Sequence, residues 1–274
     1  MAGTLFRSPR PFQSVAPTKI FMSLPPELLD EILGYLPPDY QSLRNCSLVA
    51  KSWSHPCRKR LFENVFIRYT NFQSWLGNIS PTNIELLQHV RSLYFVGSFP
   101  WQLEPSSKHT SINDLYAYFP SFCRLHAITL SHLPISSDIP QQIEAFSPCQ
   151  QALSSLTLAI VSLSWRSFIA LIDYFPNLRY LELRNLFFKD GGGNPPLLSR
   201  PVRGKLCFHP FHEVTAIAFS DWLFAELGVE YDELVVDADY SSAPYSQRII
   251  AACRKSLKCL KLGLRECFVL RTVL

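Results

Sequence analysis

Apolar and polar residues first alternate in a clear pattern between Ser23 and Pro38. The apolar residues recur at spacings of three and four, which predicts a short amphipathic helix with a broad apolar face. They are Leu28, Leu29, Ile32, Leu33 and Leu36. Proline cannot continue a helix but is favoured at its first position, so we expect the pair Pro25–Pro26 to begin this helix and Pro37–Pro38 to end it.

Two further short helices are expected directly afterwards. Asp39 can cap the first of them, whose apolar residues again recur at spacings of three and four. They are Leu43, Cys46, Val49, Ala50 and Trp53. The next helix is expected to begin at Ser54 and to include Phe62. Three such helices carry more apolar surface than they can bury among themselves, so the module needs a partner or a following domain. Leu29, Leu33 and Cys46 are the expected inward-facing residues.

A different pattern, apolar-x-x-apolar-x-apolar, recurs through the rest of the chain. Its copies begin at Val90, Leu125, Leu153, Leu178, Val214, Tyr231 and Leu257. The intervals are 35, 28, 25, 36, 17 and 26 residues, and several of them match the length of a leucine-rich repeat. In such repeats the alternate apolar residues of a short strand point inward and are covered by a helix, and the strands stack into a parallel sheet.

Segments of helical periodicity precede several of these expected strands. Ser111–Pro120 and Ser167–Pro176 both end on Tyr-Phe-Pro, and Gln141–Ser147 and Ser246–Lys255 are weaker candidates. Residues between the apolar positions of each strand should face outward, where repeat proteins usually bind a protein ligand. They include Thr157, Arg179, Glu182 and Lys261.

These patterns divide the chain into three parts. We expect a disordered leader at 1–22, a helical module at 23–67 and an irregular array at 68–274, with exposed loop insertions near 100–110 and 187–210. The leader contains Arg7, Arg10 and Lys19 without an acid, as a transit peptide would, but three prolines interrupt any amphipathic helix there. The apolar stretch Phe268–Leu274 stands where a terminal repeat needs a polar cap, which indicates a truncated array or a last strand covered in another way.

Composition and charge then narrow the classes of function. The chain has 274 residues, is 47% hydrophobic and 18% charged, and so has the composition of a folded protein with a sizeable core. A formal net charge of +4 is too small for a chain of this length to indicate nucleic-acid binding. The uncharged stretch 145–165 is interrupted by Pro148 and two glutamines, so we expect no membrane span. Eight cysteines without a Cys-x-x-Cys pair indicate reduced thiols in the cytoplasm or nucleus.

Catalytic and metal-binding motifs give no positive signal. Gly191–Gly193 lacks the Gly-Lys-Ser/Thr of a phosphate loop and is better interpreted as a linker. Cys207, His209 and His212 could share a metal, but no second ligand cluster accompanies them, and ordinary loop and strand residues are the simpler interpretation. No spacing specifies a nucleophile and its base. We therefore expect no catalytic residue, no metal and no cofactor.

The helical module resembles the F-box family. The resemblance rests on the Leu-Pro start, the proline stop and the Val-x-Lys-x-Trp ending at 49–53, which occur in order. It implies a unit that docks on a Skp1-type adaptor, which links it to a cullin–RING ubiquitin ligase. By position, the residues that would form or support the docking surface are Leu24, Pro25, Leu28, Ile32, Leu36, Leu43, Val49 and Trp53.

The remainder resembles the leucine-rich-repeat-like C-terminal half of many fungal F-box proteins. It departs from the repeat consensus, because the Asn or Cys expected three residues after the last leucine is replaced by Leu186 in the copy that begins at Leu178. The expected fold is α/β: a three-helix F-box followed by an irregular leucine-rich-repeat-like solenoid of parallel strands and helices. The implied function is a substrate receptor that recruits an unknown protein target to a Skp1–cullin–F-box ligase.

An alternative from another class is a repeat-type interaction scaffold whose helical module is only a cap. Burial of the face formed by Leu24, Pro25, Leu28 and Ile32 against residues 60–100 would favour that alternative.

Overall fold

The structure is a computed structural model. It describes residues 24–35, 40–79, 84–97, 118–134, 144, 146–189, 198–200, 202–209, 219, 229–238 and 243–264. The expected leader at 1–22 and the expected insertion at 100–110 lie outside these residues. The chain divides into two compact units, Met1–Leu61 and Phe62–Leu274, which we call the helical unit and the sheet unit.

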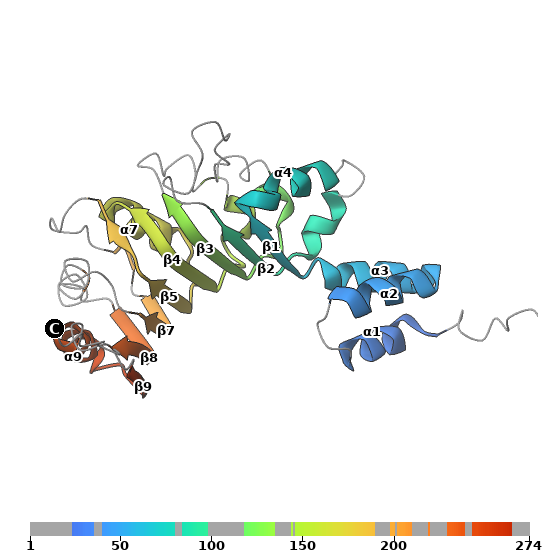
Figure 1. The fold of residues 1–274 in the computed structure, drawn as a ribbon. Coiled ribbons are helices and arrows are strands. Elements are labelled where there is room, and N and C mark those ends of the chain that lie inside the picture. The colour runs from blue at the N-terminus through green and yellow to red at the C-terminus, as the bar shows by residue number, and fades with distance from the viewer. Residues whose placement is uncertain are drawn as a thin grey trace, which may run out of the picture. The chain divides into compact units, whose positions relative to one another are not determined.

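The helical unit contains three helices, α1 (Pro26–Tyr35), α2 (Tyr40–Val49) and α3 (Lys51–Leu61) (Figure 1). As predicted from the proline pairs, α1 begins at Pro26 and ends at Tyr35. The third helix begins at Lys51 rather than at Ser54, so Trp53 belongs to α3 and Pro56 lies inside it. The guanidinium of Arg60 donates a hydrogen bond to the carbonyl of Asp30 at 2.9 Å, which ties α3 to α1.

The sheet unit is built on a nine-stranded sheet in which every pairing is parallel. The strands are β1 (Asn64–Arg68), β2 (Ser92–Val96), β3 (Ala127–Pro134), β4 (Ser155–Leu163), β5 (Tyr180–Arg184), β6 (Phe187–Phe188), β7 (Val202–Phe208), β8 (Val229–Ala238) and β9 (Cys259–Leu264). The helices are α4 (Tyr69–Asn78), α7 (Trp165–Tyr174) and α9 (Ala243–Cys253), with short 3-10 helices η2 (Ile84–His89), η4 (Phe119–Ser121) and η5 (Ser147–Cys149).

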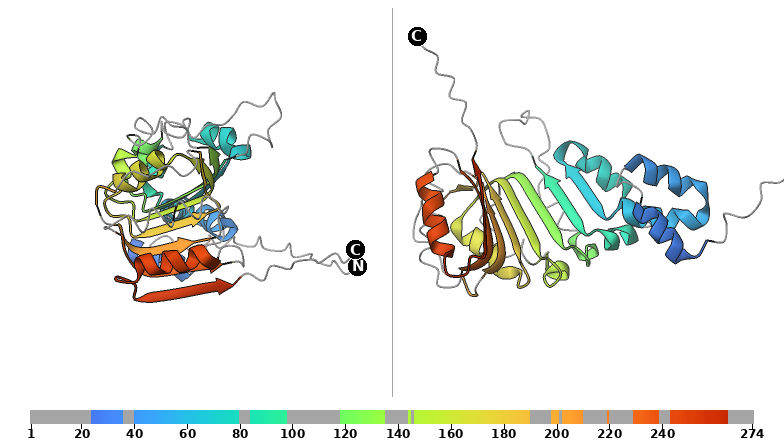
Figure 2. Two further views of the ribbon diagram at one scale, coloured as in Figure 1. Left: turned by 90° about the vertical axis from the view of Figure 1, so that its left-hand side faces the viewer. Right: turned by 90° about the horizontal axis from the view of Figure 1, so that it is seen from below.

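Spatial order follows chain order. Each of β1, β2, β3, β4, β5, β7, β8 and β9 pairs with the next in that sequence, and β6 pairs with β4. In Figure 2 the colours of neighbouring strands accordingly follow the chain from one end of the sheet to the other. The helices and strands therefore alternate as expected for an α/β unit with a parallel sheet.

Register across the sheet aligns two rows of core residues. The first row is Val65, Leu93, Ile128, Leu156, Leu181, Leu206, Leu234 and Leu260, and the second is Ile67, Phe95, Leu130, Leu158, Leu183, Phe208, Val236 and Leu262. All are buried except Leu260 and Leu262 on the last strand. Strand alternation sends both rows to one side of the sheet, where they form a continuous core.

Six of the seven predicted pattern copies lie on strands, at β2, β3, β4, β5, β8 and β9. The copy at Val214 lies outside the described residues. Besides the two-residue β6, two strands were missed. The first, β1, follows the pattern from Phe62, but such a short apolar run is compatible with either the end of a helix or a strand. The compact sheet unit begins at Phe62, so most of β1 lies within the expected helical module at 23–67.

The second missed strand, β7, corrects the expected exposed loop at 187–210. It lies inside the sheet between β5 and β8. A register irregularity between Gly204 and Lys205 breaks the spacing of its apolar residues, which hid it in the sequence. Just before it, Arg200 donates to the carbonyls of Ile172 and Pro176 at 3.0 and 2.7 Å and so satisfies the C-terminal end of α7.

Buried aliphatic residues stand at the positions where the repeat consensus has asparagine. Leu133, Val161 and Leu186 stand three residues after the second-row residues of β3, β4 and β5, and all three are buried. The residue before each of them has a positive φ: His132 at 57°, Ile160 at 55° and Asn185 at 47°. In β3, in β4 and just after β5, a residue of left-handed conformation is therefore followed by a buried aliphatic residue instead of an asparagine.

Replacing Ile160 with asparagine should stabilise the sheet unit. A β-branched residue is strained at positive φ, whereas asparagine tolerates this region, as Asn185 does just after β5. We expect the free energy of unfolding in urea to rise by up to about 1 kcal/mol. The control is Ala159→Asn, because no positive φ is recorded at Ala159, and it should not stabilise. Equal effects of the two substitutions would contradict strain at Ile160.

Aromatic residues close the helical side of the core. The Ser167–Pro176 prediction is confirmed as α7, capped by Ser164, whose Oγ accepts from the Ser167 N–H at 3.0 Å. Phe175 precedes the expected proline stop and packs on Phe146, which packs on Phe119, with ring centroids 5.7 and 4.2 Å apart. The weak candidate at 246–255 corresponds to α9, and most of the 111–120 and 141–147 candidates lies outside the described residues. No described helix is both long and apolar enough to cross a bilayer.

Candidate functional site

The helical unit exposes apolar side chains on its surface. Leu28 and Ile32, one turn apart on α1, are 46% and 41% exposed, and Val49 at the end of α2 is 64% exposed. Pro25 is exposed and Leu24 is half-buried. Five of the eight predicted docking residues are therefore at least partly exposed, and Leu36 lies outside the described residues.

The remaining predicted docking residues belong to the small core of the helical unit. Leu43 is buried together with Leu29, Leu33 and Cys57, and Trp53 packs against this cluster. Leu29 and Leu33 were predicted to face inward, which is confirmed, and Cys46 is partly buried on the same cluster. Leu43 and Trp53 can thus support a docking surface from beneath but contribute little of its area.

Sequence reasoning missed three exposed apolar residues of this unit. Tyr35, Tyr40 and Leu48 are 82%, 67% and 79% exposed. Helical periodicity could have identified Leu48. Leu43 and Cys46 define the inward side of α2, and Leu48 lies on the opposite side of that helix. Six large apolar side chains are thus exposed on a three-helix unit whose core cluster has four buried residues.

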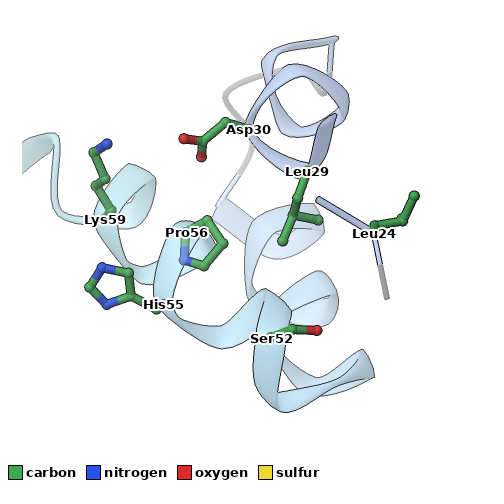
Figure 3. A pocket seen from close by; sticks show the side chains of 7 residues that line it. All are labelled: Leu24, Leu29, Asp30, Ser52, His55, Pro56 and Lys59. Atoms are coloured by element: carbon green, nitrogen blue, oxygen red, sulfur yellow. The ribbon is translucent and has the colours of Figure 1, made fainter. Parts of the chain in front are cut away.

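A pocket of about 360 Å³ lies in the helical unit, between the start of α1 and α3 (Figure 3). Its lining combines apolar and charged side chains: Leu24, Leu29, Asp30, Ser52, His55, Pro56 and Lys59. Proline has no N–H, so Pro56 cannot make the usual helical bond to the carbonyl of Ser52, also in the lining. The pocket thus joins an apolar wall to groups that can form hydrogen bonds with a docking segment.

The second candidate surface is the outward face of the sheet. Register places Phe66, Tyr94, Thr129, Thr157, Glu182, Cys207, Val235 and Lys261 in one row across it. The predicted outward positions Thr157, Glu182 and Lys261 are confirmed. Arg179 is exposed, but it precedes β5 and has the alternation of the core residues Leu181 and Leu183. The face changes in character from aromatic at β1 to charged at β9.

Glu182 is the centre of a polar network on this face. It is only 7% exposed, and its carboxylate accepts hydrogen bonds from Thr157 at 3.2 Å, Tyr180 at 3.1 Å and Arg184 Nε at 2.7 Å. Burial alone would raise the pKa of Glu182, but the bonds from Arg184, His209 and Tyr180 outweigh it and hold that pKa below its ordinary value.

His209 links this network to β8. Its Nε2 lies 3.0 Å from Glu182 Oε1 and its Nδ1 lies 2.8 Å from Asp237 Oδ2. Burial raises the pKa of the neighbouring Cys207 thiol, which disfavours the thiolate. The third residue of the metal hypothesis, His212, lies outside the described residues. In the part of the chain that the structure describes, no group of three or more His, Cys, Asp or Glu could hold a metal ion.

The charged end of the face is paired internally. Glu233 on β8 accepts from Lys205 at 2.9 Å and from Lys261 at 3.2 Å. Hydrogen bonds from both lysines lower the pKa of Glu233, and its bond raises the pKa of Lys205. These contacts link three strands by side chains, in addition to their backbone pairing.

The aromatic end is arranged differently. Phe66 and Tyr94 lie on neighbouring strands with ring centroids 6.3 Å apart, and they are 48% and 41% exposed. The guanidinium of Arg68 lies 5.0 Å from the centroid of the Phe66 ring. This is a cation–π geometry, which holds a positive charge beside exposed aromatic surface.

Comparison with known protein families gives a match over the helical unit. Residues 21–68 match the F-box-like family model. A search of curated proteins finds none that matches the chain. F-box domains bind Skp1 in cullin–RING ligases, and F-box proteins are typically adaptors rather than enzymes. The geometry and the match together support an F-box protein, and the F-box domain suggests a substrate-receptor role in a ubiquitin ligase of this type.

Proposed function

We propose that this chain is the substrate-receptor subunit of a Skp1–cullin–F-box ubiquitin ligase, in which the helical unit binds the adaptor and the sheet unit recruits a protein target. The observation that carries the proposal is the exposed pair Leu28 and Ile32 within residues that match the F-box-like model. An apolar helix face of this kind is typical of a docking surface.

The mechanism is proximity. A receptor that holds its target near a charged ubiquitin-conjugating enzyme raises the effective concentration of the acceptor lysine. The chain then needs no nucleophile or base of its own.

The proposal includes the finer fold class, a leucine-rich-repeat-like solenoid. Successive residues of the first core row, from Val65 to Leu260, are 28, 35, 28, 25, 25, 28 and 26 residues apart. Six of these seven intervals lie within the usual length of a leucine-rich repeat. The regularity appears once β7 replaces the predicted copy at Val214. A solenoid offers an extended outward face to a protein ligand.

The decisive experiment changes the exposed face of α1. Leu28→Asp combined with Ile32→Asp places two charges in an apolar interface, where they cannot be solvated. We expect binding to a purified Skp1-type adaptor to weaken at least about 100-fold, measured by titration calorimetry. The matched control is Phe187→Asp, an equally exposed apolar residue of the sheet unit at 44%, which should leave adaptor binding unchanged.

Circular dichroism and thermal unfolding must show that the variant and its control are folded. Equal adaptor affinity of the wild type and the folded double variant would remove the ligase proposal. A repeat-type scaffold with a helical cap would then be favoured.

We also propose that the protein acts in the cytoplasm or the nucleus. The seven described cysteines are all free, and four of them are buried. Reducing compartments keep such thiols unpaired. A fluorescent fusion that enters the secretory pathway would contradict this location.

A further inference from the structure

We propose that the aromatic end of the outward sheet face, formed by Phe66, Tyr94 and Arg68, is the anchor for the target. It would take a protein segment in which an aromatic or branched aliphatic side chain stands close to an acidic one. This inference rests on the proposed function, because it names the chemistry of the target that the sheet unit recruits.

Exposed apolar side chains of the outward row are concentrated at one end. Phe66 and Tyr94 are its only large apolar residues with more than two-fifths of their surface exposed, among the strands that the structure describes. The next two strands carry Thr129 and Thr157 in the same row. Exposed aromatic residues at the centre of an interface typically contribute most of the binding energy. The row therefore offers an aromatic anchor at β1 and β2.

The charged end of the outward face is unsuited to be the principal anchor. Glu182 already accepts bonds from Thr157, Tyr180 and Arg184, and Glu233 accepts from two lysines. A ligand that bound there would have to break these bonds and desolvate the groups, which costs much of what it gains. The network rigidifies the sheet and leaves little unsatisfied charge for a partner.

Arg68 places a positive charge beside these aromatic side chains. Its backbone N–H donates to Asn71 Oδ1 at 2.8 Å, while its guanidinium stacks on Phe66 and pairs with no carboxylate of the described residues. The cation–π contact fixes the guanidinium beside the aromatic surface, so a partner carboxylate would meet a positioned donor. Charge complementarity thus favours an acidic residue next to the apolar anchor of the target.

The experiment uses the folded full-length chain and two synthetic peptide libraries. Both place Phe, Trp or Leu at a central position, and one fixes Asp or Glu nearby where the other fixes Lys or Arg. We expect immobilised wild-type protein to retain the acidic library about tenfold better than the basic one. Phe66→Ser combined with Tyr94→Ser should lose retention of both libraries, and Arg68→Glu should reverse the preference.

The matched control is Lys261→Glu, the same charge reversal at the other end of the same row, which should keep the acidic preference. Three results would each overturn the anchor: retention of neither library by wild type, an unchanged preference in folded Arg68→Glu, or reversal by Lys261→Glu. Adaptor binding is measured on the same preparations. Its loss in wild type would refute the ligase role, whereas failed peptide selection with intact adaptor binding would refute the anchor alone.

Discussion

Replacing Gly204 with alanine should lower the free energy of unfolding of the sheet unit by about 3 kcal/mol. Gly204 has φ +103° inside β7, a conformation that residues with a side chain rarely adopt. An added Cβ would lie 2.2 Å from the carbonyl oxygen of Arg179. That oxygen cannot move away freely, because it accepts the backbone N–H of Lys205 at 2.7 Å. Strain and steric overlap therefore act together.

The control is Gly77→Ala in α4. Nothing lies within 4 Å of a Cβ added at Gly77, and alanine favours helix by up to about 1 kcal/mol over glycine. Urea unfolding followed by circular dichroism should therefore show loss for one substitution and no loss for the other. The helical unit has its own buried cluster, so any Gly204→Ala protein that remains folded should still bind the adaptor. Equal stability of the two variants would refute the close approach of β7 to β5.

Replacing Glu182 with glutamine should cost about 2 to 3 kcal/mol at neutral pH. The substitution keeps the shape but removes the charge that Arg184 and His209 approach, and it aims an N–H₂ group at donors that need an acceptor. Thr157→Val is the matched control, because it removes only one donor to the same carboxylate and should cost about 1 kcal/mol. Similar losses for the two variants would show that the network is not centred on Glu182.

Lowering the pH should remove the difference in unfolding free energy between the wild type and Glu182→Gln. The pKa of Glu182 is lower in the folded protein than its ordinary value, so its ionised form stabilises the fold above the unfolded pKa of about 4.3. That contribution is lost as the pH falls through the folded pKa. Glu233 is present in both proteins, so its own lowered pKa largely cancels in the comparison. Unfolding free energies of wild type and Glu182→Gln should therefore converge as the pH falls below about 4.3 and through the folded pKa of Glu182. A constant gap at all pH values would exclude the carboxylate as its source.

The local sequence was enough to predict the helices and strands whose apolar residues recur at regular spacings. The proline pairs fixed α1, because proline is favoured at the start of a helix and cannot stand in its interior without loss. Leu29 and Leu33 were predicted to face inward and are buried, but Leu28 and Ile32 have the same one-turn spacing and are exposed, so spacing alone does not select the inward pair. Six strands were identifiable because alternate apolar residues must reach the same core. The F-box-like match covers the same residues that carried the resemblance.

The three-dimensional arrangement decided what depends on residues far apart in the chain. The strand β7 lacks the regular apolar spacing, and only its neighbours β5 and β8 define its place. Leu43 belongs to a helical stripe in sequence, but packing against Leu29 and Cys57 makes it core rather than surface.

The chemistry of the outward face likewise comes from register. Glu182, His209 and Asp237 meet because three parallel strands align, and Phe66 meets Tyr94 for the same reason. Sequence alone thus determined which residues alternate toward a core, since that is set within each segment. Only the tertiary structure decided which outward residues are neighbours, because strand pairing joins residues that no local pattern relates.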